Sequence, residues 1–166
     1  MSFFGEIYRS RGHGIHSPFA YHFVSEVIGC RHPYAYYAYD VIDSLASSPH
    51  TVALSRLAHR VAVDRRPHSV GVTGCVDAAV AEGARLWSTR CAVVEGDMEA
   101  QMVIVGPATP REELPSAAGR TLLVLDNSLV DSLSAPLEEG MTFIGHRCSI
   151  IIGDRGLPLQ SFKLWF

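Results

Sequence analysis

The alternation of short apolar runs with helical or loop segments, which fills the chain from His68 onward, constrains the fold more than any other feature. Six runs of four or five residues carry the apolar, β-branched composition of buried strands. Between the first two runs, residues 77–87 have helical spacing, with Asp77 in a first turn that favours negative charge. Such alternation is typical of βαβ units and a mainly parallel sheet. The predicted strands are residues 69–72, 91–95, 102–105, 121–125, 141–144 and 148–152.

The last two predicted strands are separated only by a short connection around Gly145, His146 and Arg147. Connections of this length join antiparallel neighbours. We therefore expect an α/β fold whose mainly parallel sheet ends in an antiparallel hairpin.

The chain before the predicted sheet is rich in aromatic residues and has helical patterns. Ser17 and Pro18 are suited to an N-cap and a first helical position, and residues 19–28 continue with apolar side chains at helical spacing. Residues 52–63 have the same spacing. Residues 36–45 are also compatible with a helix, which the linker at 47–50 ends.

These patterns divide one domain into two parts. Residues 1–50 form an N-terminal helical, aromatic-rich segment that packs on the core, and residues 51–166 form the α/β core. A chain of 166 residues with 48% hydrophobic content has the usual size of a single domain.

Charge and hydropathy exclude several classes of function. The net charge is −3 and there is no run of like charges, so we expect binding neither to nucleic acid nor to a membrane surface. No apolar stretch reaches about 18 residues, which favours a cytoplasmic protein. The cysteines are too scattered for a zinc site or a disulfide framework, and we interpret them as buried thiols: Cys30, Cys75, Cys91 and Cys148.

The turn after the first predicted strand, residues 70–77, holds Gly71 and Gly74. A nucleotide-like cofactor needs a glycine-bearing turn here, so that the backbone can approach it, and an acid for its ribose. Glu95 ends a predicted strand about twenty residues later, the spacing expected of that acid. An ordinary strand-to-helix turn and a solvated strand-end carboxylate would give the same pattern.

Several segments together resemble a bacterial family of class I S-adenosylmethionine-dependent methyltransferase-like proteins. Residues 13–19, HGIHSPF, match its N-terminal HG(I/V)HSPF signature, and CAVVEGD, AQMVIVG and TLLVLDNS resemble its later strands in the same order. The closing residues 140–166 resemble its terminal hairpin. The resemblance implies a Rossmann-like three-layer sandwich with seven strands, and S-adenosylmethionine at the carboxyl ends of the first strands.

The resemblance places the cofactor-binding residues at Gly71, Thr73, Gly74, Glu95 and Asp97. Two interpretations of the second run stay open. In one, Glu95 ends the family's second strand and holds the ribose. In the other, which we prefer, VVEGD is the third strand, the second strand is deleted, and Asp97 lies near the adenine edge.

The cofactor core is shortened relative to the family. Residues 96–101 are too few for a parallel crossover that contains a helix, which needs about a dozen residues. Gly106 stands where the family has an aspartate. The acidic residue that the family carries at the end of the first strand is also missing, because its position falls at or near Gly71. We therefore predict a reduced sheet and a methyltransferase-like protein that has lost or weakened methyl transfer, either a pseudoenzyme or a binding domain.

Three side chains are the catalytic candidates. Asp126 ends a predicted strand and could accept a proton from a substrate hydroxyl, while His13 and His16 could act as acid and base. Both histidines are also explained as structural groups beside the helix start, and we prefer that interpretation. Asp126, Asn127 and Asp131 are too few and too separated for a divalent cation, so no metal site is predicted.

Two other functions stay open. One is an active S-adenosylmethionine-dependent O-methyltransferase for a small-molecule substrate, with Asp126 or His16 assisting deprotonation. The other is an oligomeric scaffold in which the aromatic N-terminal segment packs against a second copy of the chain or another partner.

Overall fold

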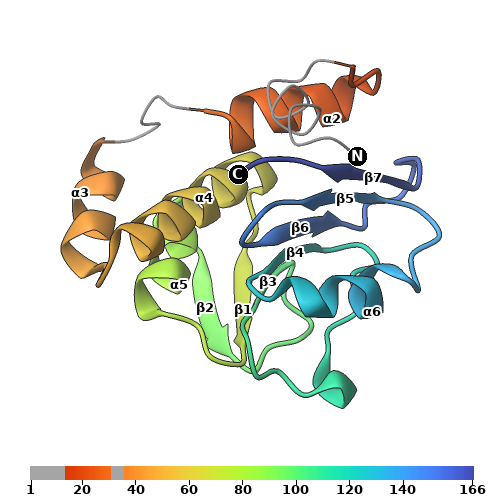
Figure 1. The fold of residues 1–166 in the computed structure, drawn as a ribbon. Coiled ribbons are helices and arrows are strands. Elements are labelled where there is room, and N and C mark those ends of the chain that lie inside the picture. Colours follow the sequence, from red (N-terminus) through yellow and green to blue (C-terminus); the bar gives the residue numbers. More distant parts are fainter. Residues whose placement is uncertain (1–13, 31–35) are drawn as a thin grey trace.

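The computed structural model describes residues 14–30 and 36–166, and it contains one mixed seven-stranded sheet with helices packed on it (Figure 1). The strand order across the sheet is β2-β1-β3-β4-β6-β5-β7. The strands are β1 (Ser69–Thr73), β2 (Ala92–Glu95), β3 (Met102–Val105), β4 (Thr121–Val124), β5 (Met141–Ile144), β6 (Ser149–Ile152) and β7 (Gln160–Lys163).

The sheet is parallel from β2 to β4 and mixed beyond it. β6 runs antiparallel to both β4 and β5, which confirms the predicted closing hairpin, and β5 pairs in parallel with β7. β7 was not among the strands predicted from apolar runs. It is an edge strand in which only Phe162 is partly buried, so it lacks the apolar run that marks a central strand. With seven strands, the sheet is not reduced in strand number, contrary to our expectation.

The N-terminal helices begin where the capping residues predict. Ser17 Oγ accepts a hydrogen bond from the Ala20 amide at 3.3 Å, and α2 (Pro18–His22) continues into a π-helical segment, η1 (Phe23–Ile28). α3 spans Tyr36–Leu45, as its pattern allowed. Ser48 caps α4 (Pro49–Arg65), so the second half of the 47–50 linker starts this helix.

The helix after β1 is shorter than the sequence pattern predicts, and the later short helices were not predicted. Asp77 is the N-cap of α5 (Ala78–Arg85) and not a first-turn residue, because its carboxylate accepts from the Ala79 amide at 2.9 Å. The sequence analysis missed three short elements in the connections after β3 and β4. They are η2 (Arg111–Glu113), η3 (Asn127–Leu129) and α6 (Val130–Ser134).

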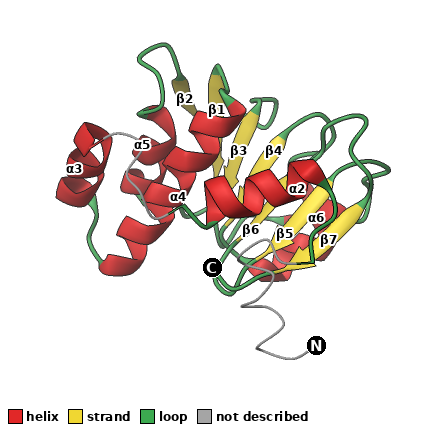
Figure 2. Ribbon diagram, turned by 90° about the horizontal axis from the view of Figure 1, so that it is seen from above, coloured by secondary structure: helices red, strands yellow, loops and turns green. Residues whose placement is uncertain are grey.

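The helices cover both faces of the sheet (Figure 2). On one face α2, η1, α4 and α5 enclose the larger hydrophobic core, and α6 closes a smaller core on the other face. Phe143 of β5 stacks between Phe23 of η1 and Phe162 of β7, with ring centroids 4.9 and 5.4 Å apart. This stack joins the N-terminal segment to the core.

The connection between β2 and β3, residues 96–101, contains no helix, as its length predicted. Because β2 and β3 lie in parallel on either side of β1, these six residues must recross β1. They pass directly over Gly71, where a Cβ atom would lie 1.9 Å from the Asp97 carbonyl oxygen and 3.3 Å from the Ala100 methyl group. Only glycine at position 71 leaves room for so short a crossover.

Among the described residues, no helix has the length and apolar character needed to cross a membrane.

Candidate functional site

The first place to look for a site is the carboxyl edge of the parallel strands. From β1 the chain moves to β2 at one side, and from β3 it moves to β4 at the other, so the strand order reverses between β1 and β3. In open α/β sheets, ligands bind in the crevice outside such a reversal.

In this chain the loops after β1 and β3 are bonded directly to each other. The Gly106 amide donates to the carbonyl oxygen of Thr73, the last residue of β1, and so extends the β1–β3 ladder by one bond. The Cys75 amide donates to the Pro107 carbonyl oxygen between the two loops, and both distances are 2.8 Å. The Thr109 hydroxyl, buried beneath them, donates to the Gly106 carbonyl oxygen at 2.8 Å. The two loops therefore satisfy each other's backbone groups across the crevice.

The glycines of these loops make that contact possible. A Cβ atom at Gly74, where φ is +70°, would lie 2.3 Å from Thr109 Oγ1, and one at Gly106 would lie 2.5 Å from the Cys75 carbonyl oxygen. Each glycine lets one backbone approach another, as it would let a backbone approach a cofactor. Here the space beside them is occupied by the chain itself.

A shallow depression of about 430 Å³ remains on the β2 side of this closed crevice. It holds two carboxylates, Glu95 and Glu113, and no basic side chain among the described residues. The depression is lined by Val72, Thr73, Gly74, Glu95, Gly96, Met98 and Glu113.

The structure brings together three of the five predicted cofactor-binding residues, Thr73, Gly74 and Glu95. The other two do not line the depression. Gly71 lies beneath the crossover, and the Asp97 carboxylate accepts from the Glu99 amide at 3.0 Å, which fixes the crossover's first turn. Of the two acids between which the interpretations differ, Glu95 lines the depression and Asp97 does not, and the preferred role of Asp97 at an adenine edge stays a prediction.

The catalytic candidates lie at opposite ends of the sheet. Asp126 follows the carboxyl end of β4, whereas His16 precedes α2, whose Phe19 ring lies 5.8 Å from the Arg65 guanidinium. Arg65 in turn donates to Thr121 Oγ1 at the start of β4. The length of β4 therefore separates His16 from Asp126, and His13 lies outside the described residues.

Asp126 has a structural role. Its carboxylate caps η3 by accepting from the Ser128 amide at 2.9 Å. This backbone hydrogen bond, with a contribution from the Ser128 hydroxyl, holds the pKa of Asp126 below its usual value. A carboxylate stabilised in its charged form is a weaker base.

The Asn127 side chain forms two hydrogen bonds within the fold. It donates to the Gly145 carbonyl oxygen at 3.0 Å and accepts from the Ser149 hydroxyl at 2.7 Å, which ties β4 to the β5–β6 turn. Within residues 14–30 and 36–166, no group of three or more histidine, cysteine, aspartate or glutamate side chains is arranged to hold a metal ion.

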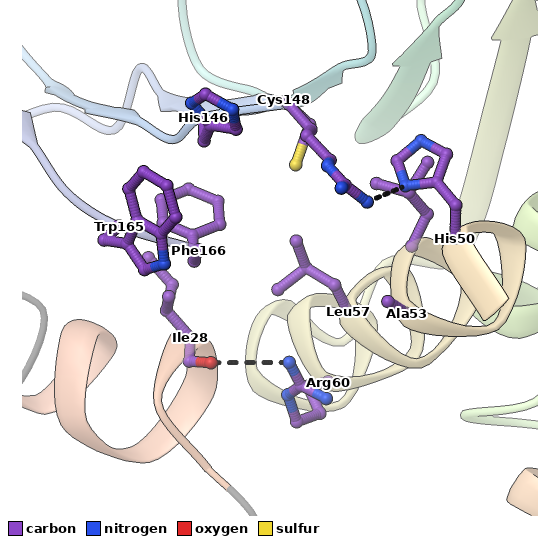
Figure 3. Close-up of a pocket in the computed structure, with 11 residues that line it drawn as sticks. Ile28, His50, Ala53, Leu57, Arg60, His146, Cys148, Trp165 and Phe166 are labelled. Carbon is purple, nitrogen blue, oxygen red and sulfur yellow. Dashed lines mark hydrogen bonds between the residues drawn. The ribbon is translucent and has the colours of Figure 1, made fainter.

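A second cavity of about 430 Å³ lies at the same edge of the sheet, farther along (Figure 3). The sequence analysis missed it because its walls come from four separate stretches and form no local motif. The available signal was the basic turn at 145–147. The lining residues are Ile28, His50, Ala53, Leu54, Leu57, Arg60, His146, Arg147, Cys148, Trp165 and Phe166.

The chain has an α/β fold with one mixed seven-stranded sheet, flanked by N-terminal helices. Comparison of the chain with protein-family models, with curated proteins and with solved structures returned no match.

Proposed function

We propose that the chain is a Rossmann-like, methyltransferase-like protein that has lost S-adenosylmethionine-dependent methyl transfer and works as a binding protein. The observation that carries this proposal is the closed crevice between the loops after β1 and β3, bridged by the Gly106 and Cys75 amides. The sequence resemblance supplies the methyltransferase part of the proposal, and the reversal of strand order between β1 and β3 is compatible with it.

The residues do not fit S-adenosylmethionine as a resident cofactor. The glycine-bearing turn should present free backbone to the cofactor, yet the Cβ position of Gly74 lies within 2.8 Å of the Gly106 and Pro107 carbonyl oxygens. Glu95 is available as a ribose-binding acid, but it shares its depression with Glu113 and is not covered by a helix after β2.

The active O-methyltransferase alternative has weaker support. It requires Asp126 or His16 to remove a proton from a substrate hydroxyl beside the cofactor. Asp126 is an N-cap whose pKa is lowered, and His16 lies toward the other end of the sheet. Neither lines the depression that holds Glu95.

Isothermal titration calorimetry with S-adenosylhomocysteine and S-adenosylmethionine tests the proposal. We expect no binding tighter than about 100 μM, roughly −5.5 kcal/mol. An active methyltransferase in the same buffer is the positive control. Tighter binding that is weakened at least about tenfold by Glu95→Gln would contradict the proposal and restore the active alternative.

An oligomeric scaffold is a second candidate, and one specific observation favours it. Tyr37, Val41 and Leu45 recur at every fourth position of α3, and their exposed fractions are 63%, 36% and 53%. This apolar stripe lies on a helix at the margin of the molecule, away from the sheet (Figure 1). Exposed apolar stripes of this kind are typical of protein interfaces.

Light scattering separates this candidate from a purely monomeric binding protein. Self-association through α3 predicts a dimer at about 100 μM protein that Leu45→Glu converts to a monomer. Glu138→Gln, on an exposed loop, is a control that should leave the dimer intact. A wild-type monomer at that concentration would remove the scaffold candidate.

A further inference from the structure

The second cavity is a half-open site between elements far apart in the sequence. η1, α4, the β5–β6 turn and the residues after β7 each contribute a wall (Figure 3). Its volume of about 430 Å³ lies within the range of small-molecule sites, roughly 300–1,000 Å³.

The polar lining of this cavity is basic. Arg60 and Arg147 are permanently charged, and the imidazoles of His50 and His146 can both donate hydrogen bonds. No aspartate or glutamate occurs among the described residues that line it. This local excess contrasts with the chain's net charge of −3 and with the two carboxylates of the β1–β2 depression.

Arg147 is the cation best placed to receive a ligand. One of its guanidinium nitrogens donates to His50 Nδ1 at 3.1 Å, and it forms no ion pair with the described residues. His50 stands in the first turn of the 17-residue helix α4, whose amino end carries partial positive charge. Arg60, by contrast, is held in the wall, because it donates to the Val27 and Ile28 carbonyl oxygens.

The remaining lining is apolar and partly aromatic. Leu54 and Leu57 of α4 line the cavity together with Cys148 and Phe166. The Trp165 ring stacks on His146 with centroids 4.8 Å apart. Burial raises the pKa of the Cys148 thiol to about 12, so this wall stays uncharged. The cavity thus joins a basic mouth to an apolar body.

We propose that this cavity binds a small organic anion with an apolar tail, of the class of medium-chain carboxylates. The carboxylate would accept hydrogen bonds from Arg147, next to His50, and the tail would lie against Leu54, Leu57 and Phe166. This site is separate from the closed crevice, and the inference does not depend on the proposed loss of methyl transfer.

The test uses three ligands that share one tail and differ in charge: octanoate, octan-1-ol and octylamine. Calorimetry on the full chain gives their affinities, and Trp165 fluorescence in the Trp87→Phe background reports binding at the cavity. We expect octanoate to bind at least about tenfold more tightly than octan-1-ol, and octylamine not to bind detectably.

Two variants localise the binding. Arg147→Gln should weaken octanoate about tenfold and leave octan-1-ol unchanged, whereas Arg155→Gln, the same charge change on the exposed turn after β6, should alter neither. Ala53→Trp fills the cavity from an exposed helix position and should abolish binding of all three ligands while the thermal unfolding transition is kept.

Three results would overturn the proposal. They are equal affinities for octanoate and octan-1-ol, equal effects of Arg147→Gln and Arg155→Gln on octanoate, and no octanoate binding up to about 5 mM, near −3 kcal/mol. Because none of these measurements involves S-adenosylmethionine, their failure is distinct from failure of the proposed function.

Discussion

Two regions at the carboxyl edge of one sheet differ in how much space they leave for a ligand. Between β1 and β3, where the strand order reverses, the loops close on each other through the Gly106 and Cys75 amides. Between α4 and the β5–β6 turn, the side chains leave a cavity of about 430 Å³ that is lined by Arg60, Arg147 and two histidines. At the position that topology favours for a ligand, the two loops are in contact and leave only a shallow depression beside β2. The larger gap between side chains lies where the sequence has no motif.

The comparison shows what a glycine at a ligand-binding position does and does not imply. Gly74 and Gly106 permit close approach, and in this chain what approaches each is the other loop. Gly71 similarly admits the crossover after β2. An open site needs in addition that no other part of the chain fills the space, and among residues 14–30 and 36–166 no side chain fills the cavity between α4 and the β5–β6 turn.

The largest expected effect concerns the support of the open cavity. Phe23→Ala removes a fully buried ring that stacks on Phe143 and holds η1, a wall of the cavity, against the sheet. We expect a loss of about 4 kcal/mol in the free energy of unfolding, measured by urea titration. Tyr21→Ala, at a 52% exposed position of the same helical segment, should cost less than about 0.5 kcal/mol. Similar losses for the two variants would mean that this segment does not pack as described.

The next effect concerns the closed region. Gly71→Ala and Gly106→Ala place a methyl group against the backbone of the crossover and of the β1 loop, and each should cost about 3 kcal/mol in urea titration. Gly96→Ala is the control, because φ is +76° there but no atom lies within 4 Å of the added carbon. It should cost only about 1 kcal/mol. Equal costs at the three positions would show that the loops are not in contact.

The two regions can also be compared in the wild-type protein, through the reactivity of one thiol from each. Cys75 is exposed in the β1 loop, whereas Cys148 is buried in the cavity wall, where burial raises its pKa to about 12. At pH 8 we expect Cys148 to react with iodoacetamide at least about a hundredfold more slowly than Cys75, as followed by peptide mass spectrometry. Comparable rates would contradict the closed wall around Cys148.

The smallest expected effect comes from a buried histidine between α4 and α5. His59 is 1% exposed, its Nδ1–H donates to the Gly83 carbonyl oxygen at 3.1 Å, and burial lowers its pKa below 6.5. The unfolded chain therefore binds a proton before the folded protein does, so stability should fall as the pH falls below about 6.5.

This single group can contribute at most about 1.4 kcal/mol per pH unit. His59→Asn should flatten that part of the stability profile between pH 7.5 and 5.5, and His68→Asn, at an exposed position, should not. Identical profiles for the wild type and His59→Asn would exclude His59 as the source.

Much of the fold could be predicted because local sequence patterns indicate where helices begin and which connections are too short for a helix. Ser17 with Pro18 marked a helix start, and the short 96–101 connection excluded a helix. β7 was missed because it is an edge strand with one partly buried ring, and α6 because it is a single short turn of helix. Such elements form through tertiary contacts and not through their own patterns.

The candidate site was less predictable. Glycine spacing identified the turn at Gly74 but could not show that Thr109 and Pro107 occupy the space beside it. His50 and Arg147 are 97 positions apart in sequence, and no spacing rule connects them. Their proximity depends on how α4 packs against the β5–β6 turn, which is a property of the whole fold.

Residue-resolved hydrogen exchange by NMR tests the closed crevice most directly. The Cys75 and Gly106 amides, which donate across it, should exchange slowly, close to the global unfolding rate. Addition of about 1 mM S-adenosylhomocysteine should change neither their exchange nor their chemical shifts. Exchange of both amides as fast as that of exposed loop amides, or shift changes at Gly74 and Glu95 on addition of the ligand, would contradict the account.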